Sequence, residues 1–327
     1  MILTNTVVLA FAGGVGAAKL ALCLARTLAP EQLTLVVNTG DDFEHLGLSI
    51  SPDLDTVMYT LAGLANPETG WGLAGETFSF LEAVARLGGE TWFRLGDRDL
   101  ATHVERTRRL GAGEGLSSIV RHFCDQLGVR AEVIPMTDDR VSTVVHTDEG
   151  ALSFQEYFVH RRCEPRVRDF EFVGIVTAKP APRLLARLAE ADALIYCPSN
   201  PYVSIAPIVN LPGLRQLIEA RRWAGMPVVA VSPIVGGSVL KGPAAKMMTE
   251  LGLESTVTAL AEHYAGTVDG LVIDRVDEEA AARIEADGIK VLATDTVMRT
   301  DEDKIRLAKE TVEFAMALKG NSDHVLR

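Results

Sequence analysis

The stretch TVVLAFAGGVGAAKLALCLARTL, residues Thr6–Leu28, decides which fold we expect for this chain. It opens with Val7–Ala12, an apolar run of the length and residue type of a fully buried strand. A glycine turn follows, and good helix formers fill Ala17–Leu28. Strand, glycine turn and helix in this order place bare backbone N–H groups and a helix N-terminus against a phosphate. The stretch therefore predicts a phosphate or nucleotide site, whose residues are Gly13, Gly14, Gly16 and Lys19.

The glycine spacing G-G-x-G-A-A is a variant of the dinucleotide fingerprint, and a plain tight turn stays an open alternative. The next predicted strand, Leu33–Val37, ends in Asn38. An acidic residue near this place would bind the ribose of a nicotinamide dinucleotide. A nicotinamide-dependent reductase is therefore disfavoured.

Length and composition fit one large domain with an insertion, or two domains, because the chain has 327 residues and is 47% hydrophobic. The formal net charge is −12, and no Lys- or Arg-rich block interrupts the chain, so nucleic acid is not an expected partner. No apolar stretch reaches about 18 residues, and no basic region precedes the first apolar run. The four cysteines lie far apart in the sequence, which favours small buried side chains. These observations predict a cytoplasmic protein without a membrane partner.

An acidic loop, residues 38–55, follows the second predicted strand and runs into a predicted helix. One aspartate there is explained as a helix cap, but four of them lie where ligands bind in open α/β sheets. Carboxylate oxygens beside a phosphate loop are the ligands that Mg2+ requires. We expect at least one of three aspartates to contact a metal or ligand, namely Asp42, Asp53 and Asp55.

Aromatic residues make up only 6% of the chain, yet several gather between positions 71 and 93. They form either a small core or a pocket for a flat ring, with Trp92 as the candidate contact. Arg94, Asp97, Arg98 and Asp99 follow around a glycine turn. They form either a surface salt-bridge cluster or a site that handles an anion.

The middle of the chain, about residues 60–188, interrupts a regular alternation of strands and helices. We interpret it as an inserted, smaller α+β region. It includes a helix predicted over Leu100–Leu110 with His103 and several arginines, one face of which we expect to be solvated. A hairpin is expected around the turn Thr147–Gly150, and the basic stretch Arg161–Arg168 is expected to be a solvated loop.

Strand and helix signals alternate again from a buried strand at Ala193–Cys197 to a last helix at Asp301–Leu318. This alternation predicts an α/β fold, with a Rossmann-like, mostly parallel sheet and helices on both faces. The expected organisation is a Rossmann-like domain over residues 1–320, with the region 60–188 inserted in it and a tail over 321–327.

Two further loops follow predicted strands of this second half. Prolines bracket Ser199 and Asn200 and fix them rigidly at the end of a strand, where they can cap a helix or donate to a phosphate or a base. A glycine loop with two lysines follows the next strand, and its candidate ligand contacts are Gly236, Gly237 and Lys241. Two such loops indicate one ligand held from both sides of the sheet.

Several motifs together resemble the 2-phospho-L-lactate transferase family of the CofD type, which acts in the biosynthesis of coenzyme F-420. They are GGVGAAK, VNTGDDFEHLGL, SPDLDTVMY, LGDRDLATH, PMTDD, CPSNPYVSI and AVSPIVGG…KGPAAKMM, in this order to about residue 270. The resemblance implies a Mg2+-dependent transferase. It would move a phosphorylated small acid from its guanosine diphosphate ester to the ribityl hydroxyl of the deazaflavin Fo and release GMP.

The resemblance also implies roles for residues and a homodimer. Asp42, Asp53 and Asp55 would hold the metal, and Asp55, Arg94 and Trp92 would contact Fo. The catalytic candidates are Asp55 or Asp97 as acceptor of the hydroxyl proton and Arg98 as a neutralising charge. The nucleotide ester would lie against the glycine loop, Ser199, Asn200, Gly236, Gly237 and Lys241.

Two readings compete with a transferase. The first is a non-catalytic regulator that binds nucleotide-sugars and controls carbon or cell-wall metabolism, and binding of Fo would separate it from the transferase. The second is the nicotinamide-dependent reductase disfavoured above. The sequence leaves open whether the donor carries 2-phospholactate, phosphoenolpyruvate or 3-phosphoglycerate.

Overall fold

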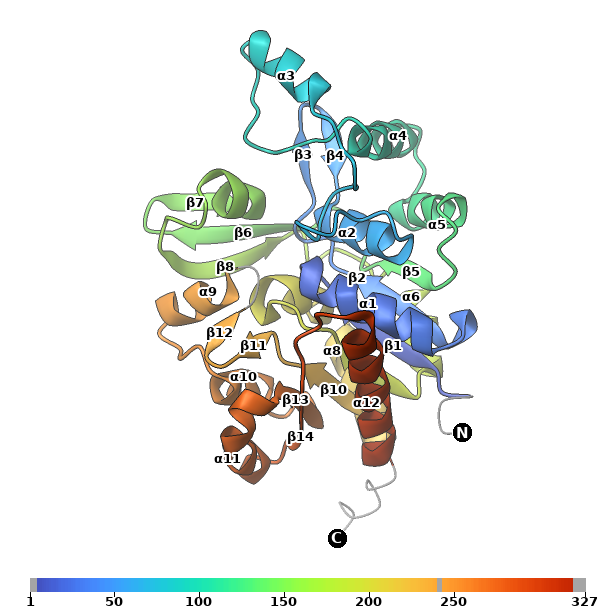
Figure 1. Cartoon of the computed structure of the whole chain (residues 1–327), viewed down its shortest axis with the longest axis vertical. Coiled ribbons are helices and arrows are strands. Elements are labelled where there is room, and N and C mark those ends of the chain that lie inside the picture. The colour runs from blue at the N-terminus through green and yellow to red at the C-terminus, as the bar shows by residue number, and fades with distance from the viewer. Residues whose placement is uncertain (1–4, 240–242, 320–327) are drawn as a thin grey trace.

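A central sheet of seven parallel strands organises the computed structural model, which describes residues 5–239 and 243–319 (Figure 1). Lys241 and the tail 321–327 lie outside the described residues. The strands in chain order are β1 (Val8–Ala12), β2 (Leu33–Val37), β5 (Glu132–Pro135), β9 (Ala193–Tyr196), β10 (Val228–Val231), β13 (Gly270–Asp274) and β14 (Lys290–Thr294). Their order across the sheet is β14-β13-β10-β9-β1-β2-β5.

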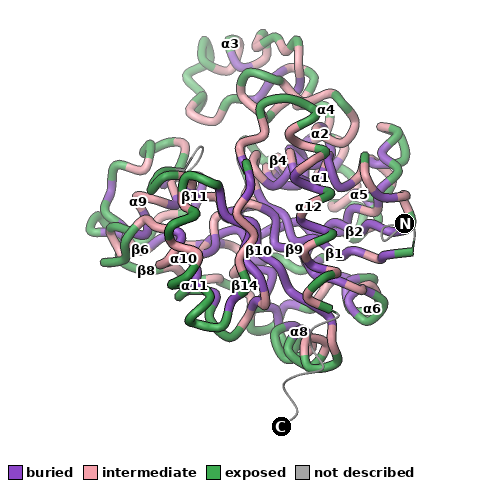
Figure 2. Tube along the Cα trace, turned by 60° about the horizontal axis from the view of Figure 1, so that its bottom comes forward, coloured by how far each residue is buried: buried purple, intermediate pink, exposed green. Residues whose placement is uncertain are grey.

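Both faces of this sheet are covered by helices, as predicted. Alternate residues of one strand enter opposite cores: Leu9 and Phe11 pack in one, Val8 and Ala10 in the other. A burial map shows the strands as the buried centre of the molecule (Figure 2). One face is covered by α1 (Gly14–Thr27), α2 (Pro52–Leu61), α5 (Leu116–Gln126) and α12 (Asp301–Lys319). The other is covered by α6 (Leu184–Glu190), α7 (Ala206–Val209), α8 (Leu214–Trp223), α10 (Val257–Tyr264) and α11 (Ala281–Ala286).

The strand order reverses between β1 and β9, because the chain first adds β2 and β5 on one side of β1 and then builds outward from β9 on the other. Ligands of open α/β sheets bind at such a reversal, beyond the carboxyl ends of the strands. We call this side of the sheet the carboxyl edge. The glycine turn and the loop with Ser199 and Asn200 both lie there, because they directly follow β1 and β9.

The region 60–188 interrupts the alternation but also returns one strand, β5, to the main sheet. Its helices α3 (Ser79–Arg86) and α4 (Asp99–Gly111) lie beyond the carboxyl edge, with α3 at the top of Figure 1. The expected hairpin is confirmed: β6 (Ser142–Thr147) pairs antiparallel with β7 (Gly150–Ser153). The expectation of a loop up to Arg168 is wrong, since β8 (Val167–Val173) pairs with β6.

Shorter elements complete the described chain. They are β3 (Phe43–His45), β4 (Leu48–Ile50), β11 (Ile234–Val235), β12 (Ser238–Val239), α9 (Ala244–Glu250), and single turns at Pro30–Gln32, Glu156–His160, Pro201–Ile205 and Arg275–Ala280. β3 and β4 form a hairpin within the acidic loop. Within the described ranges, no helix has both the length and the apolar character that crossing a membrane requires.

Candidate functional site

Asp53 ties three elements together at the carboxyl edge. Its Oδ1 accepts a hydrogen bond of 2.8 Å from the N–H of Gly14, and its Oδ2 accepts one of 3.0 Å from Nδ2 of Asn38. Asn38 also accepts the N–H of Gly40 with its Oδ1 at 2.8 Å. Burial raises the pKa of Asp53 to about 6, against the effect of these hydrogen bonds. Asp53 therefore joins the acidic loop to the start of α1.

The glycine turn is packed closely against the segment that follows β9. A Cβ on Gly13 would lie 2.7 Å from Cβ of Ser204, and a Cβ on Gly16 would lie 2.7 Å from the carbonyl oxygen of Pro198. Gly14 has a φ of +76°, a conformation that favours glycine. Since the N–H of Gly14 already donates to Asp53, the tight-turn alternative has direct structural support, and phosphate binding at this turn stays a prediction.

Ser199 and Asn200 differ in how their side chains are used. Asn200 caps the next turn, accepting from the N–H groups of Tyr202 at 2.9 Å and Val203 at 3.4 Å. Ser199 is buried, and its Oγ has no hydrogen-bond partner among the residues that the structure describes. Buried polar atoms nearly always have a partner. The Ser199 hydroxyl is therefore available to a ligand beside β1.

Asp42 keeps one carboxylate oxygen free. Its Oδ2 accepts a hydrogen bond of 2.7 Å from Oγ of Ser51, whereas its Oδ1 is buried without a partner in residues 5–239 and 243–319. Burial raises the pKa of Asp42, and the negative charges of Asp55 and Asp53 add to this effect. The pKa of neighbouring Asp41 is raised by burial and then by the charge of Asp53. Crowded, buried carboxylates of this kind favour a cation between them.

Asp42 also lines a cleft of about 200 Å³ between the β3–β4 hairpin and the ends of α4 and α5. Thr39 lines the same cleft, and its buried Oγ1 likewise lacks a partner in the described part of the chain. Asp138 and Asp139, from the PMTDD motif, close another side. The cleft is therefore lined by four acidic side chains and one arginine, and an unpaired oxygen of Asp42 and one of Thr39 lie buried behind its wall.

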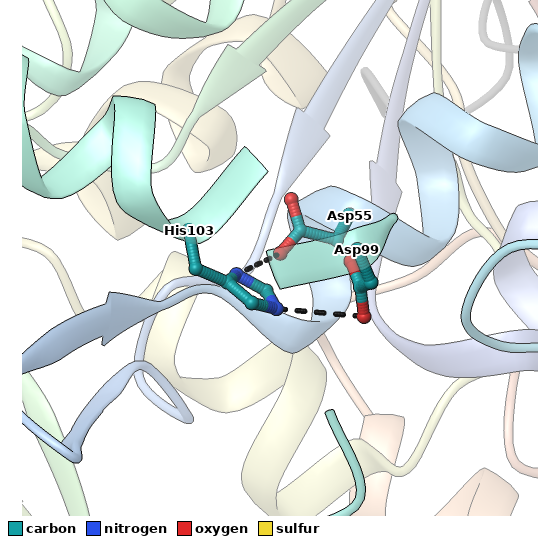
Figure 3. A group of neighbouring side chains, drawn as sticks. All are labelled: Asp55, Asp99 and His103. Carbon is teal, nitrogen blue, oxygen red and sulfur yellow. Dashed lines mark ion pairs between the residues drawn. The ribbon is translucent and has the colours of Figure 1, made fainter. Parts of the chain in front are cut away.

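Asp55 lies at the centre of a buried network with α4 (Figure 3). Both of its carboxylate oxygens accept hydrogen bonds from the guanidinium of Arg106, and its Oδ2 lies 3.6 Å from Nδ1 of His103. Nε2 of His103 lies 3.4 Å from Asp99, which accepts a bond of 2.6 Å from the hydroxyl of Tyr59. Burial raises the pKa of Asp55, and the charge of Arg106 opposes that rise.

The helix around His103 has the expected solvated face, on which Arg108 is exposed, but His103 and Arg106 lie on a buried face and are 2% and 0% exposed. The sequence indicated Asp99 only as part of the mixed-charge cluster with Arg94, Asp97 and Arg98, and it did not indicate His103 and Arg106 as members of the site. The spacing of Asp99, His103 and Arg106 could have indicated that they lie together, because residues three and four apart share one face of a helix. A polar face usually meets water, but this one meets α2.

The LGDRD motif forms reciprocal helix caps. Asp97 accepts from Oγ1 of Thr77 and from the N–H groups of Ser79 and Phe80 at the start of α3. Glu76 in turn accepts the N–H groups of residues 98 and 99 at the start of α4. The side chain of Arg98 donates to the carbonyl oxygen of residue 74 at 2.8 Å. These bonds favour capping over a catalytic role for Asp97, and Asp99 is the motif residue that joins the Asp55 network.

Trp92 belongs to an aromatic cluster that joins the β3–β4 hairpin to two other segments. It stacks on His160 with ring centroids 5.1 Å apart, and Phe43 and Phe93 complete the cluster. Arg94 is exposed, with its guanidinium 4.3 Å from the ring centre of Phe78. Of the aromatic residues that the sequence grouped, Trp92 and Phe93 contact each other, and their other ring partners, Phe43, His45 and His160, lie outside that group. Arg94 is accessible to a ligand.

The second glycine loop is exposed at Gly236 and Gly237, and the N–H of Gly236 donates to Asp277 at 2.9 Å. Of its two lysines, Lys241 lies outside the described residues. Lys246 donates to the carbonyl oxygen of Pro165 at 3.0 Å and to Glu250, so it fastens α9 to the inserted region.

Among the described residues, one group of three or more carboxylate, histidine or cysteine side chains has its ligand atoms all within 4.8 Å of one another, namely Asp55, Asp99 and His103. The predicted metal ligands Asp42, Asp53 and Asp55 do not form such a group. Arg106 occupies both oxygens of Asp55, and Mg2+ prefers oxygen to imidazole. Asp42, with its unpaired oxygen, fits a magnesium ion best.

Three comparisons relate this chain to known proteins. The family model "2-phospho-L-lactate transferase CofD" matches residues 8–313. The chain is 42% identical to a phosphoenolpyruvate transferase of Streptomyces coelicolor, over 94% of this chain and 98% of that protein. It is 40% identical to a 2-phospho-L-lactate transferase of Methanocaldococcus jannaschii, over 95% and 99% respectively. A crystal structure of a UPF0052-family protein from Bacillus halodurans has the same fold, with a TM-score of 0.61, 14% identity and coverage of 94% and 98%.

Proposed function

The chain belongs to the 2-phospho-L-lactate transferase CofD family, and from this premise we propose the reaction that it catalyses. It is an enzyme, a transferase of the phosphoenolpyruvate or 2-phospholactate type, acting in coenzyme F-420 biosynthesis. In the proposed reaction, the donor is a guanosine diphosphate ester of the small acid, the acceptor is the ribityl hydroxyl of the deazaflavin Fo, and GMP is released.

One observation supports this reaction above the others. Asp42 and Thr39 line a cleft with Glu44, Asp138 and Asp139, and each keeps a buried side-chain oxygen that has no partner among the described residues. The hydroxyl of Ser199, at the reversal of strand order, likewise has no partner among them. Transfer from a diphosphate ester requires positioning and neutralisation of oxygen charge more than a protein nucleophile. A site with carboxylates on one side and a helix start on the other suits such a donor.

We place the donor at the carboxyl edge, where the strand order reverses between β1 and β9. Its diphosphate would approach the start of α1, and the donor contacts would be Gly13, Gly14, Gly16, Lys19, Ser199, Asn200, Gly236, Gly237 and Lys241. Asp42 would hold Mg2+. Asp53 and Asp55, the other metal ligands that the resemblance implies, already accept hydrogen bonds from Gly14, Asn38 and Arg106. When bound, the ion would neutralise charge on the diphosphate oxygens.

The acceptor would lie on the side of Arg94 and Trp92. Its hydroxyl oxygen attacks the phosphorus that carries the small acid, the bond from that phosphorus to GMP breaks, and Asp55 accepts the hydroxyl proton. A carboxylate whose pKa is raised by burial is a better base than an exposed one. We prefer Asp55 to Asp97 for this role because burial raises the pKa of Asp55, whereas the hydrogen bonds from Thr77 and the start of α3 lower the pKa of Asp97.

Sequence identity does not decide which small acid the donor carries, because the phosphoenolpyruvate transferase and the 2-phospho-L-lactate transferase are 42% and 40% identical to this chain. The experiment is an assay of the purified protein with Fo, Mg2+ and each of three donors, in which GMP is joined through a diphosphate bond to the phosphate of 2-phospholactate, phosphoenolpyruvate or 3-phosphoglycerate. Mass spectrometry should detect a phospho-acyl derivative of Fo together with GMP, and the fastest ester identifies the donor.

An unchanged Fo with all three esters would refute the transferase proposal. A nucleotide-sugar that raises the melting temperature in that case would favour the regulator. The homodimer that the resemblance implies is a separate proposal, for which light scattering after size-exclusion chromatography gives the mass in solution.

A further inference from the structure

Arg106 is a buried cation whose position calls for an explanation. Its side chain is 0% exposed and lies on α4, outside the motifs that suggested a role in the reaction. Removing an ion pair from water is costly, and apolar side chains of similar volume often stabilise a protein as well or better. Stability alone is therefore a weak reason for an arginine here.

The guanidinium of Arg106 binds both oxygens of Asp55 and also contacts His103 beside it. Nη1 and Nη2 donate to different oxygens of the carboxylate, so the plane of the carboxylate is set by the planar donor. Nη1 also lies 3.3 Å from Nδ1 of His103, which approaches the same carboxylate. Asp55 is thereby held from one side. We call this pair of hydrogen bonds from Nη1 and Nη2 the fork, which the single ammonium of a lysine could not reproduce.

The same guanidinium also fixes strand β4. Its Nη1 donates to the carbonyl oxygen of Ser49 at 3.3 Å, and Oγ1 of Thr107, the next residue of α4, accepts the N–H of Ser49 at 2.8 Å. Two residues further on, Ser51 donates its hydroxyl to Asp42 at 2.7 Å. Arg106 therefore connects Asp55 to the segment that orients Asp42.

We propose that Arg106 is a positioning residue, which sets the orientation of Asp55 directly and that of Asp42 through β4 and Ser51. It does not touch substrate. This inference rests on the proposed function, in which Asp55 and Asp42 serve the acceptor and the metal. Misplacement of reacting groups by about 1 Å can lower a rate by about a hundredfold, so loss of the fork should appear in kcat.

The test compares R106K, which keeps the charge and loses the fork, with R106M, which loses both. R108M is the matched control, because Arg108 is an exposed residue of the same helix that pairs with Glu105. Melting temperature, kcat and KM for each substrate are measured on every folded variant. Hydrogen exchange of peptides that cover residues 43–51 reports on β4 without any substrate.

We expect R106K to fold, to exchange β4 amides faster than the wild type, and to lose at least tenfold in kcat, with KM for the nucleotide ester changed by less than about threefold. R108M should match the wild type in all of these. Wild-type kcat and wild-type exchange in R106K would overturn the inference even if R106M fails to fold. Absence of Fo transfer in the wild type would refute the proposed function instead, and faster β4 exchange in R106K would then support only the structural link.

Discussion

Substitution of Gly13 by alanine tests whether the glycine turn is shaped by packing. The added Cβ would lie 2.7 Å from Cβ of Ser204 and 2.8 Å from Oδ2 of Asp53, whereas ordinary contacts are 3.4–4 Å. Gly13 has a φ of −159°, an extended conformation that alanine adopts freely, so no backbone strain contributes. The whole effect should come from steric overlap with two buried neighbours.

The magnitude follows from the cost of overpacking, which is about 1–3 kcal/mol. An unfolding entropy of about 2.1 cal/mol/K per residue gives about 0.7 kcal/mol/K for 327 residues. Gly13→Ala should therefore lower the melting temperature by about 1.5–4 °C. Because relief of the overlap moves Asp53 or the start of α1, kcat should also fall by about ten- to a hundredfold.

The matched control is Gly111→Ala at the end of α4. There an added Cβ meets no atom within 4 Å, and the backbone is not left-handed. Alanine is favoured over glycine in a helix by up to about 1 kcal/mol, so this variant should be as stable as the wild type or slightly more stable. Calorimetry and the transferase assay are run on both variants. A Gly13→Ala protein with wild-type melting temperature and kcat would refute the packing argument.

Three further predictions concern single side chains at the carboxyl edge. The pKa of Asp53 in the folded protein, about 6, exceeds its usual value of 3.8, so the folded protein binds the Asp53 proton more tightly than the unfolded chain does. The stabilisation that this proton provides is lost as pH rises from about 4 to 6. Urea midpoints of the wild type should therefore fall more steeply over this range than those of Asp53→Asn, and parallel curves would contradict this. Asp97→Ser should keep α3 capped and kcat within about twofold, whereas Asp97→Ala should lower the melting temperature because the N–H groups at the start of α3 lose their acceptor. Loss of kcat in a stable Asp97→Ser would restore a catalytic role. Arg94→Ala should change the melting temperature by less than about 1 °C, because the side chain is exposed, but raise KM for Fo about tenfold; an unchanged KM would remove Arg94 from the Fo site.

The order of strands and helices could be read from the sequence because its signals are local. Val8–Ala12 and Gly270–Asp274 are apolar runs that only a doubly covered parallel sheet accommodates, and both are fully buried strands. The acids in the first turn of α12 mark its start at Asp301. The edge strand β8 was missed because charged residues alternate along it, and its exposed face resembles a loop in composition.

The sequence by itself determined the sheet, the positions of the loops at its carboxyl edge and the family to which the chain belongs. Only the tertiary structure decided which aspartates keep a free oxygen. Asp53 meets Gly14 across 39 positions and Asp55 meets Arg106 across 51, whereas one oxygen of Asp42 stays unpaired among the described residues. The physical reason is that a carboxylate's partners depend on which chain segments pack beside it, and no spacing along the chain records that. The same holds for the polar face of α4, which would be solvated on an isolated helix and is buried here because α2 supplies its counter-charge.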